Sequence, residues 1–240
     1  SSAASDVYKR QHLYNSIVSF ANKLCRALGF YGDYEIAHAI RFAITATLLR
    51  VIYLFVFPFS LIGDESYYWE WGRNLDWGYY SKPPMIGWLM GITHLMGAET
   101  APFVRLPATL FGGGILYLQY LIGRTLFSPK IGFFAMFFLC VSPAHSALCL
   151  LFTIDAPLLF FWSLALLAFW KVFYEEKGFA WIIILILGLG LGNLTKQMTL
   201  VFSILGVLVL VLDHSKRKFL RLPMLWLSLI HISEPTRRIT

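Results

Sequence analysis

Five charged residues lie at the edges of long apolar segments and could together carry out a transfer reaction. Asp64 and Glu65 follow the first apolar run, Asp155 stands in FTIDAP between two later runs, and Lys82 and Lys196 stand near other runs. A carboxylate can act as a general base on an acceptor hydroxyl, and a cation can stabilise the charge of a departing phosphate. These residue types at a lipid boundary indicate a reaction between a lipid-linked phosphate donor and a hydroxyl acceptor.

The acids also have a structural interpretation. Asp64 and Asp155 both stand where a helix is expected to begin, so either carboxylate could instead accept backbone N–H bonds as an N-cap. On a helix, Asp64 shares a face with Tyr68 and Trp71, whereas Glu65 points elsewhere. At most one member of the acidic pair is therefore expected to reach a given substrate atom.

Three cations are expected to contact the donor phosphate: Lys82, Arg105 and Lys196. Two prolines follow Lys82 and restrict its backbone to extended conformations, which fixes the placement of this side chain. Arg105 and Lys196 stand at the ends of apolar runs, so anchoring to lipid phosphates is an equal alternative for both. His94 and His145 have no partner at metal-ligand spacing, and the sequence has no H-E-x-x-H motif; we therefore assign no metal site.

The composition places these residues in a membrane. The chain of 240 residues is 58% hydrophobic and only 14% charged, whereas soluble domains carry about 25% charged residues, so an ordinary soluble enzyme is excluded. Runs of about 17–25 apolar residues can cross a bilayer. We expect an all-α, polytopic transmembrane helix bundle with about six spans, at Phe42–Ile62, Leu106–Gly123, Ile131–Leu151, Pro157–Phe173, Phe179–Leu194 and Met198–Leu212.

The loops between these spans indicate the orientation. Segment 63–105 is long and rich in Tyr and Trp, which predicts short helices at the membrane interface. Eleven Lys and Arg residues lie in one set of loops and four in the other, namely 12–41, 124–130, 171–178 and 213–222 against 63–105, 152–156 and 195–197. The positive-inside rule makes the first set cytoplasmic, which accounts for the net charge of +7 without a nucleic-acid partner. Arg50, inside the first span, is expected to snorkel toward the cytoplasmic side.

Both ends of the chain look foreign to this membrane segment. The sequences SSAASDVYKRQ at 1–11 and LSLIHISEPTRR at 227–238 resemble in-frame translations of the adaptors used in transposon-based DNA library preparation. We therefore expect residues 1–11 and 227–240 to be adaptor-derived. Residues 12–41 are then a cytoplasmic lead-in, and 42–226 are the N-terminal part of a longer transmembrane domain.

Five motifs in order resemble the polyprenyl-phosphate-dependent glycosyltransferases of the C-type fold. The most similar members are the aminoarabinose transferase-like enzymes that modify lipid A, and protein O-mannosyltransferases are more distant relatives. The motifs are GDESYYWEW at 63–71, LDWGYYSKPPMIGWL at 75–89, VRLPA at 104–108, SPAHSALCLLFTIDAPLLFFW at 142–162 and LGNLTK at 191–196.

The resemblance implies an enzyme of the bacterial inner membrane with its active site on the periplasmic face. Its donor is a sugar on a polyprenyl phosphate, its acceptor is a lipid or glycan hydroxyl, and transfer inverts the anomeric centre. Asp64 matches the catalytic base or acceptor-orienting acid, and Asp155 matches a second functional acid. Lys82 matches the lysine that contacts the donor phosphate, and Lys196 matches a lysine at the end of the fifth span.

Two positions depart from the family pattern. Ser81 stands where many relatives have an acidic residue. In some of those relatives this acid helps to bind a metal, so the resemblance does not by itself imply a divalent metal cofactor here. Ile154 replaces a proline that is common before the second acid, a change that concerns the stiffness of the loop.

Three other functions remain open from the sequence. A protein O-mannosyltransferase-like enzyme would use the same fold with a protein acceptor. A lipid or solute transporter would also place charges in the bilayer, but these charges are typically paired in mid-span on broken helices. A non-catalytic membrane scaffold would leave the aromatic and acidic outer loop unexplained. The acids at one membrane edge favour the glycosyltransferase.

Overall fold

The computed structural model describes residues 15, 16, 18–20, 23, 34–96 and 100–217, and all regular structure within them is helical. The expected adaptor-derived ends, and most of the expected lead-in, lie outside the described residues. The helices are α2 (Ile36–Val56), α3 (Gly63–Arg73), α4 (Met85–Leu95), α5 (Ala101–Leu126), α6 (Pro129–Val141), α7 (Pro143–Leu150), α8 (Asp155–Phe173), α9 (Phe179–Thr195) and α10 (Thr199–Leu212). The prediction of an all-α fold is confirmed.

Helices occupy all six ranges in which spans were expected, although their lengths vary. Three of them, α2, α5 and α8, are long and apolar enough to cross a membrane, and the bent pair α6–α7 raises this number to four. Helices α9 and α10 have 17 and 14 residues, which is about 26 and 21 Å of helix against a hydrocarbon core of about 30 Å. By length, therefore, the structure supports three spans, or four if α6 and α7 form one. Spans at α9 and α10 stay predictions.

The first span begins and ends earlier than expected. Phe57 precedes Pro58 and leaves the helical region, with φ −121° and ψ 67°, because a residue before proline is disfavoured in helical conformation. Arg50 consequently lies about 21 Å along the axis from Ile36, in the part of α2 toward its C-terminal end. Its Nη2 donates to the carbonyl oxygen of Cys140 at 2.9 Å. The expectation that Arg50 snorkels to the cytoplasmic side is therefore wrong.

The third expected span is broken. α6 and α7 meet at an angle of 67°, because Pro143 has no N–H and drives Ser142 into an extended conformation with ψ 130°. The Ser142 N–H turns back to the carbonyl of Leu139 at 3.1 Å. Pro143 marks the position of this break in the sequence. The residues on either side of it are apolar, however, so hydropathy alone predicts one continuous span.

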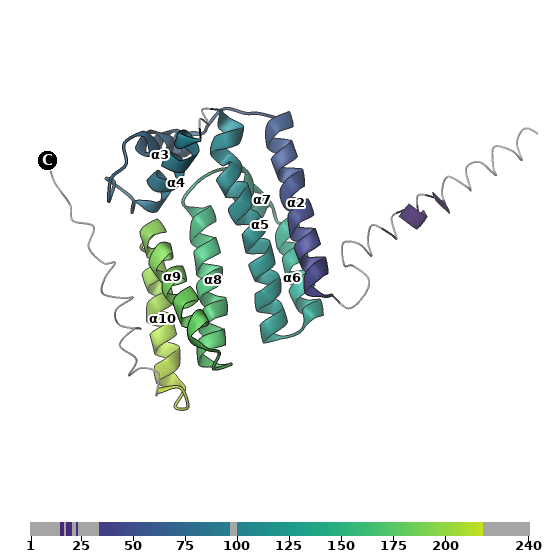
Figure 1. The fold of residues 1–240 in the computed structure, drawn as a ribbon, viewed down its shortest axis with the longest axis vertical. Coiled ribbons are helices and arrows are strands. Elements are labelled where there is room, and N and C mark those ends of the chain that lie inside the picture. Colours follow the sequence, from purple (N-terminus) through teal and green to yellow (C-terminus); the bar gives the residue numbers. More distant parts are fainter. Residues whose placement is uncertain (1–14, 17, 21–22, 24–33, 97–99, 218–240) are drawn as a thin grey trace, which may run out of the picture.

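α5 is the central helix of the bundle. It packs against α2, α6, α7 and α8, and α9 lies along α8 with α10 beyond it (Figure 1). Three consecutive glycines allow this close packing, since an added Cβ on Gly112, Gly113 or Gly114 would collide with side chains of α7, α2 and α8 respectively. Small residues at a helix interface allow the backbones to approach closely in this way.

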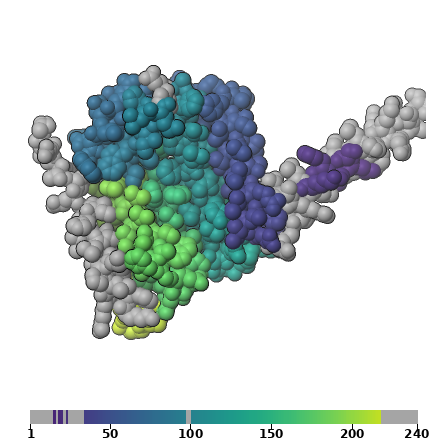
Figure 2. Space-filling model, viewed as in Figure 1, coloured from purple at the N-terminus to yellow at the C-terminus, as the bar shows by residue number. Residues whose placement is uncertain are grey.

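The two short helices expected in segment 63–105 are α3 and α4. They pack on each other, and α4 also contacts α5 and α9. Figure 1 shows the pair at one end of the bundle, above α9 and α10 and beside the upper end of α5, and the space-filling view shows it in the same place (Figure 2). The N-terminus of α8 and the C-terminus of α9 approach the same end, so residues far apart in the sequence gather there.

The opposite end of α5 depends on a contact between two glycines. A Cβ on Gly132 of α6 would collide with backbone atoms of Tyr120 and Arg124, and one on Gly123 would collide with the backbone of Gly132. Because backbone cannot move aside as a side chain can, Gly132→Ala is expected to lower the free energy of unfolding by about 1–3 kcal/mol. Thermal unfolding in detergent measures this loss. Gly178→Ala is the control, because nothing lies within 4 Å of that position, and equal melting temperatures for the two variants would contradict the prediction.

Candidate active site

Asp64 stands in the first turn of α3 with a free carboxylate. The helix begins at Gly63 with Ile62 as its N-cap residue, so Asp64 does not occupy the capping position that the alternative interpretation required. Its side chain is exposed and forms no hydrogen bond within the described residues. Glu65 satisfies the helix end instead, since its Oε2 accepts the Ile62 N–H at 3.1 Å.

Glu65 forms a buried ion pair with Arg105 of α5. The Arg105 Nε donates to Glu65 Oε1 at 2.8 Å, and Nη2 donates to Oε2. The two side chains are only 0% and 1% exposed. The remaining Arg105 donors reach the carbonyls of Phe59 and Ser60 at 2.8 and 2.9 Å, so this guanidinium is engaged on both of its edges.

This pair fastens two segments that are distant in sequence. Arg105 holds the α2–α3 connection through Phe59 and Ser60, while Glu65 Oε1 also accepts the N–H of Phe152 in the α7–α8 connection at 2.8 Å. The sequence assigned Glu65 to catalysis and Arg105 to the donor phosphate or to lipid anchoring. Because both side chains are enclosed and fully paired, we give them a positioning role in place of a substrate contact.

Asp155 and Lys196 come together at the same end of the bundle. Asp155 is the first residue of α8, and Ile154 takes the N-cap position that the alternative interpretation gave to the acid. Lys196 follows the last residue of α9, and its Nζ lies 3.2 Å from Asp155 Oδ1. Their side chains are 34% and 52% exposed for Lys196 and Asp155, so the pair contributes at most about 1 kcal/mol to stability. Its importance is that both groups remain open to a ligand.

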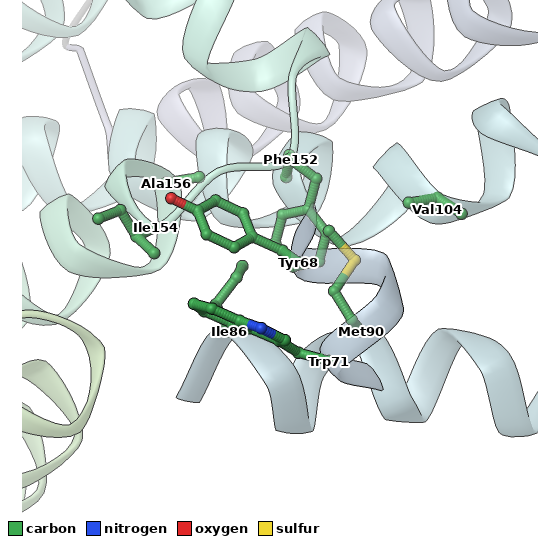
Figure 3. Packing of buried hydrophobic residues seen from close by; sticks show 9 residues of the cluster. Tyr68, Trp71, Ile86, Met90, Val104, Phe152, Ile154 and Ala156 are labelled. Atoms are coloured by element: carbon green, nitrogen blue, oxygen red, sulfur yellow. The ribbon is translucent and has the colours of Figure 1, made fainter. Parts of the chain in front are cut away.

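Tyr68 lies within electrostatic reach of both acids. It is buried among Trp71, Ile86 and other apolar side chains, and its hydroxyl points toward the start of α8 (Figure 3). Burial raises the pKa of this hydroxyl above its usual 10.0, and the charges of Asp64 and Asp155 raise it further. Both carboxylates therefore lie within electrostatic reach of one hydroxyl, although they come from different elements. The sequence placed Tyr68 on the face of Asp64 but gave no sign of its approach to Asp155.

Lys82 stands in a firmly held loop between α3 and α4. The ring of Tyr79 stacks on Trp71 with centroids 4.4 Å apart, and its hydroxyl donates to the Trp71 carbonyl at 3.1 Å. The Tyr79 N–H in turn donates to the carbonyl of Lys82 at 3.1 Å. The Lys82 side chain is half-buried, and its ammonium has no hydrogen-bond or ion-pair partner within the described residues.

A metal site finds no support in the described part of the chain. No three His, Cys, Asp or Glu side chains gather there closely enough to hold an ion.

Tyr68→Phe tests the protonation of the Tyr68 hydroxyl. Because its pKa is raised in the folded protein, the hydroxyl keeps its proton when the same group in the unfolded chain has lost it. Its contribution to stability is therefore present below pH 10 and is lost as the pH rises through the folded pKa. Between about pH 9 and 11, the variant is expected to lose less stability than the parent in thermal unfolding. Tyr80→Phe is the control, since Tyr80 is 99% exposed; identical pH profiles for Tyr68→Phe and the parent would refute the prediction.

Comparison with known proteins identifies the family of the chain. Residues 81–233 match the family of dolichyl-phosphate-mannose-protein mannosyltransferases. The chain belongs to this family. The match includes Lys82, Arg105, Asp155 and Lys196, while Asp64 and Glu65 precede it. The family and the apolar helices together make the chain part of a multi-pass membrane protein, and the resemblance to polyprenyl-phosphate-dependent C-type glycosyltransferases is confirmed.

A curated relative extends the comparison. Lipid A galacturonosyltransferase RgtD of Rhizobium johnstonii is 30% identical over 205 residues, which are 80% of this chain and 43% of the relative. The chain thus spans less than half the length of that protein. No solved structure matches the chain.

Proposed function

We propose that the full-length protein is a membrane glycosyltransferase that moves a sugar from a polyprenyl-phosphate donor to a hydroxyl of lipid A or another cell-envelope acceptor. The observation that carries the proposal is the open Asp155–Lys196 pair at the end of the bundle that α3 and α4 occupy, where α3 also presents the exposed carboxylate of Asp64. The family and the activity in the relative's name fit the same reaction.

Asp64 is the general base in this proposal. Its carboxylate is exposed and unpaired within the described residues, whereas the carboxylate of Asp155 is held by Lys196. Asp64 takes the proton of the acceptor hydroxyl, and the hydroxyl oxygen forms a bond to the anomeric carbon of the donor sugar. The bond from that carbon to the phosphate oxygen breaks, and polyprenyl phosphate leaves with the electron pair. Displacement from the opposite side inverts the anomeric centre.

The cations stabilise the leaving group. Lys82 has a free ammonium on a rigid loop, which suits it to meet the negative charge that develops on the departing phosphate. Lys196 is the second cation, and Asp155 keeps it oriented while helping to place the acceptor. Arg105 takes no part at the phosphate because its guanidinium is enclosed by Glu65 and two carbonyl groups.

The site is proposed to face the outside of a bacterial plasma membrane. Asp64, Lys82, Asp155 and Lys196 belong to connections on one side of the bundle, and most of the basic residues belong to connections on the other. Since basic loops are retained in the cytoplasm, the acidic side faces the periplasm. Lipid-linked donors and lipid acceptors both reach a site at this depth.

A protein hydroxyl is the second candidate acceptor, because the family description names protein mannosyltransferases. A transporter is less well supported. The ion pairs among the described residues lie at or beyond helix ends, as Asp155–Lys196 and Lys171–Glu175 do, whereas transport sites pair charges near the bilayer midplane.

The test is a transfer assay with the full-length protein in proteoliposomes. Undecaprenyl-phosphate sugars are supplied with either lipid A or a Ser/Thr-rich peptide as acceptor, and labelled sugar is followed into each. Lys82→Met is expected to lower kcat/KM by about 10- to 100-fold, because one charge-assisted contact to the phosphate is lost. Lys130→Met, at the N-terminus of α6, is the matched control and is expected to be neutral. Absence of transfer from every donor to either acceptor would overturn the proposal.

A further inference from the structure

Arg50 is a charged residue at bilayer depth that the proposed reaction does not use. Its Nη2 donates to the carbonyl oxygen of Cys140 at 2.9 Å and lies 3.6 Å from the Cys140 sulfur. Its Nη1 is buried and has no hydrogen-bond partner among the described residues. Burying a guanidinium with an open donor is costly, and ionisable residues inside a membrane span indicate function by default.

The carbonyl group that Arg50 binds lies at the C-terminal end of α6, where the α6–α7 span is broken. Cys140 stands one residue before the end of α6, where carbonyl groups have no partner within the helix and the helix dipole is negative. Pro143 prevents α6 from continuing, so the Cys140 carbonyl lacks the partner that a further turn of helix would supply, at a depth where water is scarce. A cation donating from α2 satisfies the carbonyl and complements the dipole at once.

The corner capped by Arg50 leads directly to the candidate active site. α7 has only eight residues, and its last turn is fixed where Thr109 Oγ1 donates to the Cys149 carbonyl at 2.8 Å. The chain then passes through Phe152, whose N–H is held by Glu65 at 2.8 Å, and reaches Asp155. The guanidinium also lies within electrostatic reach of His145 and Cys149 on α7. α7 and the connection after it therefore join the corner that Arg50 caps to Asp155.

We propose that Arg50 is a positioning residue for Asp155. Its guanidinium caps the C-terminal end of α6, holds the α6–α7 corner against α2, and so fixes the direction from which α7 delivers the Phe152–Asp155 segment. The inference rests on the proposed function only for its catalytic consequence, because the positional effect can be measured without turnover.

The experiment compares full-length Arg50→Met and Arg50→Lys with the parent protein in detergent. Hydrogen exchange is followed on the peptide 150–156, which contains the Phe152 N–H, and on peptides from α8 and α9. Arg50→Met is expected to accelerate exchange in 150–156 by about tenfold or more, since a charge-assisted bond that holds the corner is lost. Arg50→Lys should restore most of the protection, because its ammonium can still donate to the carbonyl. Leu49→Met is the control, as Leu49 is 62% exposed and is expected to leave exchange unchanged.

Turnover gives the second readout. Arg50→Met is expected to lower kcat by about 10- to 100-fold, with the donor KM changed by less than about twofold, because displacement of a reacting group by about 1 Å has effects of this size. Unchanged exchange in 150–156 would overturn the inference even if activity falls. Equal acceleration in α8 and α9 would also overturn it, since that pattern indicates general destabilisation. If the parent protein transfers no sugar, the proposed function fails while the exchange result still decides the role of Arg50.

Discussion

Replacing Asp64 with Asn is expected to reduce sugar transfer by about 10²- to 10⁴-fold, the usual contribution of a general base. The amide has the size of the carboxylate but cannot accept the proton of the acceptor hydroxyl. Asp64 is exposed and forms no hydrogen bond within the described residues, so the fold loses at most about 1 kcal/mol, from the interaction of its charge with the N-terminal end of α3. The loss should therefore appear in kcat, with only a small change in the melting temperature.

The measurement uses the same proteoliposome assay with purified, full-length variants. Glu70→Gln is the matched control, because Glu70 is also an exposed acid on α3 and its amide variant is expected to be fully active. Asp155→Asn should also lower kcat, but it should in addition release Lys196. If Asp64→Asn and Asp155→Asn both retain full activity, the catalytic assignment fails.

Arg105→Met is expected to have the largest effect on stability, lowering the free energy of unfolding by about 3–5 kcal/mol. The substitution leaves the Glu65 carboxylate buried without its cation and leaves the carbonyls of Phe59 and Ser60 without donors. Because Glu65 and Arg105 belong to one network, the double variant Glu65→Leu/Arg105→Met should cost less than the sum of the single variants. Denaturant or thermal unfolding in detergent measures each value.

The control for this prediction is a partly exposed ion pair of the same protein. Lys171 and Glu175 lie one helical turn apart at 2.7 Å with side chains 20% and 29% exposed, and such pairs contribute at most about 1 kcal/mol. Lys171→Met should therefore shift the melting temperature far less than Arg105→Met. Comparable shifts for the two variants would mean that the buried pair does not fasten the outer segments.

Much of the fold follows from local sequence signals. Apolar length predicted helices over all six span ranges, and the aromatic loop predicted α3 and α4. The predicted start of α2 differs from the structure because the residues from Ile36 to Arg41 mix polar and apolar types. Its predicted end differs because Pro58 stops the helix within an apolar run. The break at Pro143 was missed since span prediction averages hydropathy over a long window, in which a single proline changes little.

The candidate site was predictable only in part. Topology alone brought Asp64, Asp155 and Lys196 to one side of the membrane. The partnership of Glu65 with Arg105 joins residues 40 positions apart, and no periodicity or spacing encodes such a contact. We assign both residues a positioning role because they are buried. Their burial depends on how α5 packs against the α2–α3 and α7–α8 connections. The approach of Tyr68 to Asp155 has the same origin.

The bond from Phe152 to Glu65 also bears on how the site responds to its bilayer. Membranes of different thickness tilt helices and shift their ends, and α2 and α8 could respond to such a change independently. One carboxylate, however, joins the turn that carries Asp64 to the segment that carries Asp155. We therefore expect a change in lipid thickness to alter the tilt of α2 and α8 more than it alters the distance between the two acids.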